Sequence, residues 1–199
     1  CYNNKVNESS KNAFDDMNAF GPATYAMITF MQSPNFVRFL ESVTGIDDIL
    51  VDNELYGGGI HQTLSGGFLH VHSDFNKRDF VRRRVNVFLY LNPDWKEEYG
   101  GHLELWSRDL QRCQARVSPS LGKLAIFSTT DFSFHGHPKP LSCPKDRSRR
   151  SLALYYYSRT RPSHECLNND CNGSNHMTLW QNTSCPSCHD DQKCYISTA

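Results

Sequence analysis

Residues 66–76 read GGFLHVHSDFN, and this stretch is the most informative in the chain. It has the composition of a strand and ends on the triplet His72-Ser73-Asp74. Side chains two residues apart on a strand point to the same face, so His72 and Asp74 share a face. A second imidazole, His135, comes from a later strand. Together the two imidazoles and the carboxylate make a set of metal ligands.

The chemistry of this set narrows the choice of metal. Two His and one carboxylate form the facial triad of non-haem Fe(II) oxygenases, which leaves three positions open for a co-substrate and oxygen. Arg149 follows further along the chain and can bind a carboxylate through two hydrogen bonds, as a 2-oxo acid would require. The alternative for His72 and Asp74 is a hydrogen-bonded pair at the surface.

Spacing alone leaves neighbouring residues open as alternatives. His70 lies two residues before His72, and His137 lies two residues after His135, so each shares a face with a candidate ligand. Arg149 and Arg150 are adjacent and therefore point to opposite faces of a strand, one to the pocket and one to solvent.

Composition limits the class of protein. The chain has 199 residues, of which 38% are hydrophobic and 12% aromatic, enough for one core that is rich in strands. Its formal net charge is zero, so we expect neither a nucleic-acid partner nor attraction to a membrane surface. No apolar run reaches the length of a membrane span, and we expect no membrane segment.

Cysteine is concentrated in the tail. Five of the eight Cys fall within residues 166–194, which predicts a disulfide-stabilised tail made in an oxidising compartment. Sequons begin at Asn7, Asn172 and Asn182 and predict a glycoprotein. We therefore expect the lumen of the secretory pathway (endoplasmic reticulum or Golgi) or the extracellular space. A zinc site around Cys185 and Cys188 is the alternative, although the full ligand pattern is absent.

The first part of the chain predicts helices. Residues 1–20 are polar and suggest a loose lead-in, and residues 24–31 suggest a helix. A second helix starts at the N-cap Ser33 and ends at Gly45. Its predicted apolar face, which we expect against the outside of a sheet, consists of Phe36, Phe39, Leu40 and Val43.

From about residue 55 the pattern changes to strands. The stretch 85–91 alternates and places Asn86, Phe88 and Tyr90 on one face, a mixed set suited to the wall of a pocket. At least six strands with Gly and Pro turns indicate a β-sandwich or jelly roll. The predicted strands are 56–61, 68–74, 85–91, 102–106, 124–127 and 151–157.

Three further expectations concern the domain boundary and the loops. We place one domain at residues 1–161 and the Cys-rich tail at 162–199. The loop 75–84 is expected to be a substrate flap, and the run 82–84 within it a solvated strand edge. Cys113 and Cys143 are expected to pair with each other.

Four motifs, in this order, resemble the 2-oxoglutarate/Fe(II)-dependent oxygenases of the prolyl 4-hydroxylase-like family. The first is the stretch 66–76 quoted above, and the second is VNVFLYLNPDW at 85–95. The third is GGHLEL at 100–105, and the fourth is SFHGHP at 133–138 followed by RRSLALYYY at 149–157. The resemblance covers roughly residues 55–158, and the tail has no recognised counterpart.

The resemblance implies a mainly β fold with supporting α-helices, a distorted double-stranded β-helix (jelly roll) carrying the Cys-rich tail. It implies that His72, Asp74 and His135 bind Fe(II), and that Arg149 and Tyr90 hold the distal carboxylate of 2-oxoglutarate. Molecular oxygen would be consumed, succinate and CO₂ released, and ascorbate would serve as reductant. The implied substrate is a peptide or protein containing proline, which is hydroxylated.

Other functions remain open. The enzyme could oxidise another residue or a small molecule. A catalytically silent β-helix that only binds a metal would keep the fold, but it would be expected to lack a ligand or the Arg. A zinc-binding cupin-like or lectin domain could use the same ligand set, but it gives no reason for Arg149 or Tyr90. Metal analysis under reducing conditions would distinguish the silent domain and the zinc-binding domain from an oxygenase.

Overall fold

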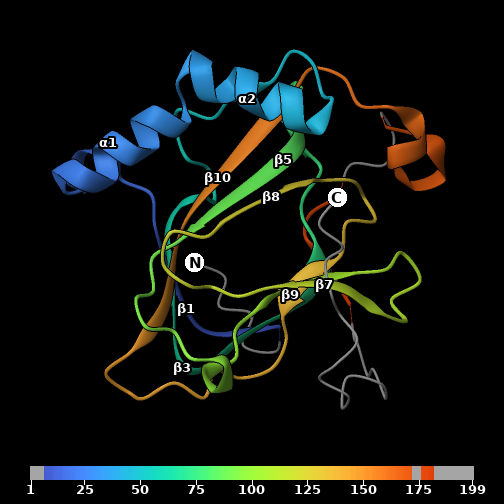
Figure 1. The fold of residues 1–199 in the computed structure, drawn as a ribbon. Coiled ribbons are helices and arrows are strands. Elements are labelled where there is room, and N and C mark those ends of the chain that lie inside the picture. Colours follow the sequence, from blue (N-terminus) through green and yellow to red (C-terminus); the bar gives the residue numbers. More distant parts are fainter. Residues whose placement is uncertain (1–6, 172–175, 182–199) are drawn as a thin grey trace.

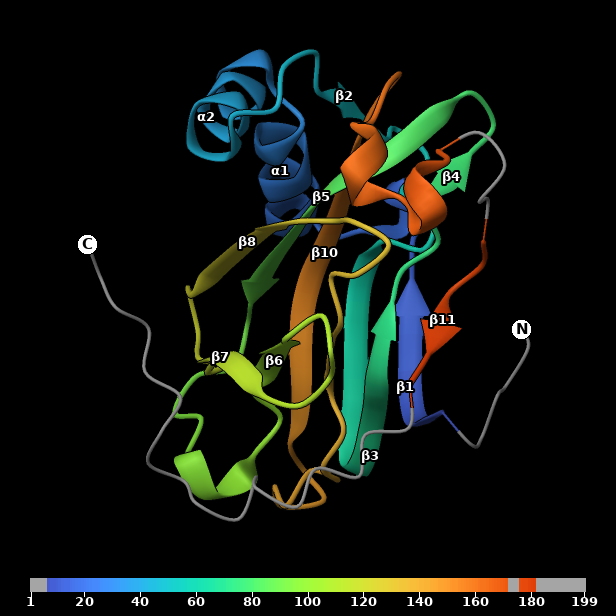
Figure 2. The same cartoon turned by 90° about the vertical axis from the view of Figure 1, so that its right-hand side faces the viewer.

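Two layers of antiparallel strands face each other, and helices cover the outer side of one layer (Figures 1 and 2). The computed structural model describes residues 7–171 and 176–181. Its helices are α1 (Pro22–Met31), α2 (Pro34–Thr44), η1 (Met17–Ala19), η2 (Glu97–Tyr99), η3 (Ser163–Glu165) and η4 (Leu167–Asn169). Its strands are β1 (Glu8–Phe14), β2 (Leu50–Val51), β3 (Gly59–Ser73), β4 (Lys77–Arg78), β5 (Val81–Tyr90), β6 (Leu103–Trp106), β7 (Cys113–Val117), β8 (Leu124–Ser128), β9 (His135–His137), β10 (Ser148–Ser158) and β11 (Leu179–Trp180).

The long strand β3 belongs to both layers. Its first part, residues 59–64, pairs with β10, and β10 pairs with β5, which pairs with β8. Its second part pairs with β9 at Leu69 and His72, and β9 pairs with β6, which pairs with β7. This path makes two facing four-stranded layers joined by one strand. The predicted double-stranded β-helix is confirmed.

The helices pack on the outer face of the first layer. Residues of even number on β10, among them Leu154 and Tyr156, join Ile28 and Leu40 in the main apolar cluster. The hydroxyl of Tyr156 donates a hydrogen bond of 2.7 Å to the carbonyl of Met31. Because successive strand residues alternate in direction, the odd-numbered residues of β10 point to the other layer. Packing of the helices therefore fixes which side chains face the interior.

The second helix agrees with its predicted ends but only in part with its predicted face. Ser33 accepts a hydrogen bond from the backbone of Phe36, and Gly45 has φ 67°, as a left-handed C-cap requires. Phe36 and Leu40 are buried, whereas Phe39 and Val43 are 44% and 54% exposed. The buried stripe is thus narrower than the predicted apolar face.

One expectation about loops was wrong. Residues 8–14, expected within a loose lead-in, form β1 and pair with β3 from Phe14↔Ile60 to Glu8↔Leu69. Its side chains are half-buried or exposed, which explains why its sequence is polar. Residues 75–84, expected as a substrate flap, contain the hairpin of β4 and β5, and their role toward a substrate stays a prediction.

Two expectations about side chains were also wrong. The run 82–84, expected to be solvated, is buried, with Arg83 only 2% exposed. Cys113 and Cys143 do not pair with each other: the thiol of Cys113 lies 3.4 Å from the carbonyl of Ala115, and that of Cys143 lies 3.6 Å from the carbonyl of Arg147. The CxxC at 185–188 and the sequons at 172 and 182 lie outside the described residues.

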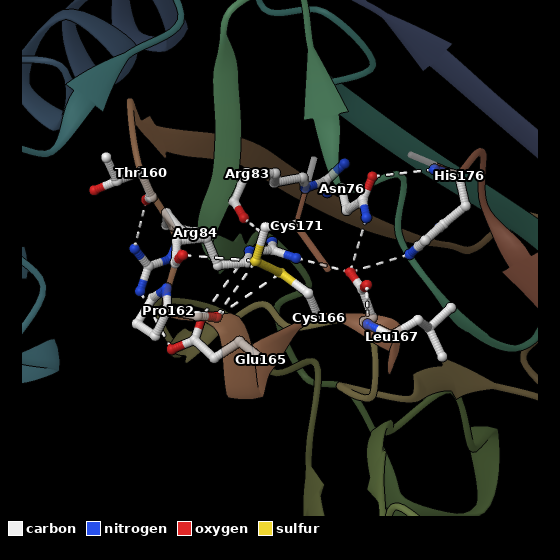
Figure 3. Close-up of a disulfide and its surroundings, with 12 residues drawn as sticks. Asn76, Arg83, Arg84, Thr160, Pro162, Glu165, Cys166, Leu167, Cys171 and His176 are labelled. Carbon is white, nitrogen blue, oxygen red and sulfur yellow. Dashed lines mark hydrogen bonds and ion pairs between the residues drawn. A yellow bond between two sulfur atoms is a disulfide. The ribbon is translucent and has the colours of Figure 1, made fainter. Parts of the chain in front are cut away.

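The described part of the tail is packed on the core around the buried carboxylate of Asp131. This carboxylate pairs with Arg161 at 2.8 Å and with His176 at 3.1 Å. It also accepts hydrogen bonds from the side chain of Asn76 and the backbone of Leu167, at 3.0 and 2.8 Å. Figure 3 shows these partners beside the disulfide that joins Cys166 to Cys171, within the predicted disulfide-rich tail.

Neither α-helix of the described residues has the length and apolar character that crossing a bilayer would require.

We predict that Asp131→Asn lowers the free energy of unfolding by about 3 kcal/mol, because the buried guanidinium of Arg161 loses the nearer of its two carboxylate partners. Chemical denaturation would measure the loss, and Asp109→Asn, at an exposed carboxylate, should change stability little. Equal stability of the two variants would show that Asp131 does not hold the tail in place.

We predict that the difference in stability between wild type and Asp131→Asn depends on pH. Burial alone would raise the pKa of Asp131, but the hydrogen bonds from His176 and Leu167 hold it below the usual 3.8. A carboxylate with a depressed folded-state pKa stabilises the protein above its unfolded pKa and loses that effect as the pH falls through the folded pKa. The stability difference between wild type and Asp131→Asn should therefore shrink in acid below about pH 4.

Candidate functional site

A cavity lies between the two layers and is lined by both of them. β3 and β9 contribute His72, His135 and His137, and the odd-numbered residues of β10 contribute Arg149 and Ser151. Further lining residues come from β1, β5 and the tail, namely Glu8, Lys11, Arg83, Phe88, Thr178 and Trp180. The cavity thus gathers polar side chains from segments that are far apart in the sequence.

His72, Asp74 and His135 come together in this cavity. One ligand atom from each lies within 4.8 Å of the other two, and no other such group of three occurs among the described residues. Nε2 of His72 lies 3.6 Å from Oδ1 of Asp74, and Nε2 of His135 lies 3.4 Å from Oδ2. The pairing of β3 with β9 sets His72 opposite His135 and so creates the contact between their rings.

Both imidazoles are held in the form that a metal needs. Nδ1 of His72 donates to the carbonyl of His70 at 2.8 Å, and Nδ1 of His135 donates to the carbonyl of Ser133 at 2.9 Å. A carbonyl only accepts hydrogen bonds, so Nδ1 of each ring carries a proton and Nε2 faces the other members of the group. Backbone geometry thereby selects the tautomer.

The charges of the three groups also suit a cation. Burial lowers the pKa of His135 to about 4, so its ring is neutral at pH 7. Burial would raise the pKa of Asp74, but the Arg83 guanidinium and the nearby imidazoles hold it well below its usual value. At neutral pH the site therefore offers the neutral imidazole of His135 and the anionic carboxylate of Asp74, ligand types that bind divalent transition metals.

The two histidines that the sequence left open lie elsewhere. The ring of His70 packs on Phe68, with 4.8 Å between ring centroids, and it does not line the cavity. A register irregularity in the pairing of β3 with β9, between Leu69 and His72, separates the two histidines that simple alternation would put on one face. His137 does line the cavity, but outside the group of three.

Arg149 is buried beside Tyr90, while Arg150 is exposed, as alternation predicts for adjacent residues. Nε of Arg149 donates to the carbonyl of Gly101 at 2.7 Å, and Nη2 donates to the hydroxyl of Tyr90 at 3.2 Å. A Cβ at Gly101 would come within 3.0 Å of the Arg149 side chain, and this residue has φ 72°. Glycine here lets the guanidinium reach the cavity in a fixed orientation.

Buried polar groups surround the Arg149 end of the cavity. Burial lowers the pKa of His61 to about 3 and also lowers that of His137, so both rings are neutral. Among the described residues, Nδ1 of His137 is buried without a hydrogen-bond partner. An orphaned buried polar atom next to a guanidinium fits a bound carboxylate ligand such as a 2-oxo acid.

Sequence reasoning placed Asn86 on the wall of a pocket, but it predicted neither Asn86 nor Arg83 as a contact of Asp74. Asn86 donates to Oδ2 of Asp74 at 2.8 Å, and Nη2 of Arg83 lies 3.1 Å from the same oxygen. The pairing of β5 with β10 shifts register, because Tyr156 pairs with Val85 and Tyr157 with Arg83. This β-bulge turns Arg83 to the cavity, where simple alternation would place Arg84.

The tail also contributes a side chain to the site, which the sequence did not predict. β11 pairs with β3 at Ser73 and His72, and Gln181 donates its backbone N–H to the carbonyl of Val71 at 2.8 Å. The ring of Trp180 lies against His72, with 4.9 Å between centroids. No motif in the sequence signals this contact, because it depends on how the tail folds back (Figure 2).

Comparison with known proteins shows which family the region around the site matches. The chain matches the 2OG-Fe(II) oxygenase superfamily over residues 58–157, which include His72, Asp74, His135, Arg149 and Tyr90. Both the site and the two layers that carry it thus fall within the matched region.

Individual relatives carry related activities in their names. The chain is 40% identical over 86 residues to prolyl 3-hydroxylase OGFOD1 of Mus musculus, a match that covers 40% of this chain and 15% of that protein. The viral collagen prolyl hydroxylase vCPH of Paramecium Bursaria Chlorella virus-1, solved in complex with 2OG, is similar with a TM-score of 0.50 and 15% identity, covering 70% of this chain and 76% of that one. A prolyl-4-hydroxylase of Pseudomonas putida is 26% identical with a TM-score of 0.43, covering 68% of this chain and 62% of that one.

We predict that the wild-type protein binds one Co(II), a spectroscopic substitute for Fe(II), and that His135→Ala loses this binding. His70→Ala and His137→Ala are matched controls that remove a neighbouring imidazole, and His70→Ala keeps the carbonyl that orients His72. Equilibrium dialysis followed by metal analysis measures the stoichiometry. Loss of Co(II) in His137→Ala with retention in His135→Ala would reverse the assignment of the ligand.

Proposed function

The chain belongs to the 2OG-Fe(II) oxygenase superfamily, and from this premise we propose that it is a 2-oxoglutarate- and O₂-dependent hydroxylase of prolyl residues in peptides or proteins. One observation carries the proposal: the His72, Asp74 and His135 group and the Arg149–Tyr90 pair lie in or beside one cavity. The assignment of the specific substrate and products rests on this inference and on the activities in the names of the relatives.

In the proposed enzyme, Nε2 of His72, Nε2 of His135 and the carboxylate of Asp74 hold the iron. Arg149 binds the distal carboxylate of 2-oxoglutarate, and the hydroxyl of Tyr90 orients the guanidinium for that contact. The bound iron, 2-oxoglutarate and oxygen supply the oxidation, in which the co-substrate becomes succinate and CO₂ and one oxygen atom enters a substrate C–H bond. Ascorbate is the proposed reductant that keeps the iron ferrous.

The protein contributes orientation and exclusion of water to this chemistry. The neutral form of His135 keeps its nitrogen lone pair available at physiological pH. Burial of Arg149 and Tyr90 places the carboxylate contact where it is not weakened by solvent. Aromatic side chains at the cavity, among them Phe88 and Trp180, offer an apolar surface to a prolyl ring.

A zinc-binding domain and a silent metal-binding domain are the alternatives of another class. The buried Arg149–Tyr90 pair and the unpartnered Nδ1 of His137 favour the oxygenase, because a site that binds only a metal has no need of a second, anion-binding group. Among oxygenases, one acting on another residue or on a small molecule would have the same first set of ligands.

We also propose that residues 1–161 form the oxygenase domain and that residues 162–199 form the attached tail. We further propose that the protein is made in the secretory pathway and is glycosylated there. The disulfide between Cys166 and Cys171 supports an oxidising compartment. A glycosidase-dependent mobility shift of the protein expressed in animal cells tests the proposed glycosylation.

We predict that peptides containing proline raise succinate release from 2-oxoglutarate in the presence of Fe(II) and ascorbate, and that His135→Ala abolishes it. Mass spectrometry of the peptide should show the addition of one oxygen atom. Turnover that no peptide raises would move the substrate to another residue or a small molecule. Absence of turnover in a folded protein with bound iron would favour the silent domain.

We predict that Trp180→Ala raises KM for the peptide about tenfold and leaves the affinity for 2-oxoglutarate nearly unchanged, since its ring flanks His72 on the tail side. The control is Met177→Ala, which removes an exposed side chain of the same tail segment. An unchanged KM in Trp180→Ala would place the peptide away from the tail.

A further inference from the structure

We propose that Arg83 and Asn86 are positioning residues for the metal-binding carboxylate. They contact Oδ2 of Asp74 and so fix the orientation of its carboxylate toward the two imidazoles. The inference rests on the proposed function only in taking Asp74 as a ligand, and it names two residues that act through Asp74 and not on the substrate.

The three side chains form a closed triangle of contacts. Nδ2 of Asn86 donates to Oδ2 of Asp74 at 2.8 Å, and Nη2 of Arg83 lies 3.1 Å from the same oxygen. Nε of Arg83 donates to Oδ1 of Asn86 at 2.9 Å, which fixes the orientation of the amide. Each member therefore holds the other two in place.

The two oxygens of Asp74 face different imidazoles. Oδ2 accepts the hydrogen bond of Asn86, forms the ion pair with Arg83 and lies 3.4 Å from Nε2 of His135. Oδ1 lies 3.6 Å from Nε2 of His72. The carboxylate held by Arg83 and Asn86 therefore sits between the two imidazoles.

Arg83 is itself rigid. Its side chain is 2% exposed, and its guanidinium stacks 3.3 Å above the ring of Tyr155 and 4.8 Å from that of Phe75. A guanidinium held over an aromatic ring loses little further freedom when it pairs with a carboxylate. Arg83 alone would be enough to neutralise the charge of Asp74. The uncharged Asn86 also donates to the same oxygen, which indicates a role in orienting the carboxylate.

Orientation of this carboxylate matters for the chemistry. Two imidazoles and one carboxylate on one face of a metal would leave positions open for a co-substrate and oxygen. By contacting Asp74, Arg83 and Asn86 keep its carboxylate beside the two imidazoles.

The neighbouring Arg84 provides a matched control. It is also buried, but it points away from the cavity, where its guanidinium contacts the hydroxyl of Ser158, the carbonyl of Thr160 and the carboxylate of Glu165. Replacing it removes a buried arginine next to Arg83 in sequence without touching Asp74.

The experiment compares Arg83→Met, Asn86→Leu and Arg84→Met in the full chain. Equilibrium dialysis gives Kd for Co(II) without 2-oxoglutarate or peptide, visible absorption of the Co(II) protein reports coordination, and melting of the metal-free protein reports stability. Loss of contacts that orient a ligand weakens metal binding by about 10- to 100-fold. We expect this loss and an altered spectrum in Arg83→Met and Asn86→Leu. Arg84→Met should keep the wild-type Kd and spectrum even where its melting temperature falls.

Wild-type Kd and spectrum in both Arg83→Met and Asn86→Leu would overturn the proposal. So would an equal loss of Co(II) affinity in Arg84→Met, since the effect would then be damage to the fold, and so would a wild-type protein that binds no Co(II). Failure of every peptide to be hydroxylated, with the predicted order of Co(II) affinities intact, would remove the proposed function and leave this inference standing.

Discussion

The buried carboxylate of Asp74 is the constraint on which the site depends. An ionised carboxylate removed from water is strongly destabilised unless positive charge and hydrogen-bond donors surround it. Here the guanidinium of Arg83 and the amide of Asn86 supply part of that compensation, and they come from β5 of the first layer. The imidazoles come from β3 and β9 of the second layer. The charge of one side chain therefore ties the two layers together where a metal would bind.

Bending of β3 from one layer into the other is what places these groups within reach. Its first part pairs with β10, which carries Arg149, and its second part carries His72 beside β9. The anion-binding end and the metal-binding end of the cavity thus lie along one continuous strand. Close approach of the backbones supports this arrangement: a Cβ on Gly136, between the two histidines of β9, would come within 2.8 Å of the carbonyls of Leu69 and His70.

The sequence predicts regular features well, because alternation and turn chemistry are local. The β-sandwich or jelly roll, the ends of α2 and the opposite facing of Arg149 and Arg150 follow from such patterns, whereas the double-stranded β-helix was implied by the resemblance to a known family. The sequence does not predict the irregularities of strand pairing. A bulge at Arg84 turns Arg83 inward, and a register shift in β3 separates His70 from His72. The polar strand β1 also escaped prediction, since a half-exposed strand carries little apolar signal. These features depend on which strands pair and in which register, and the sequence of a single strand does not reveal this.

The tail illustrates the same limit at a larger scale. Its cysteines predict a disulfide-stabilised segment, yet nothing in their spacing indicates that β11 lies beside His72. That placement depends on Asp131, whose single carboxylate contacts Arg161 just before η3, Leu167 within η4 and His176 ahead of β11. Because the three contacts share one buried carboxylate, each strengthens the others. The described part of the tail is therefore anchored at Asp131, and the wall that Trp180 gives to the cavity depends on that anchor.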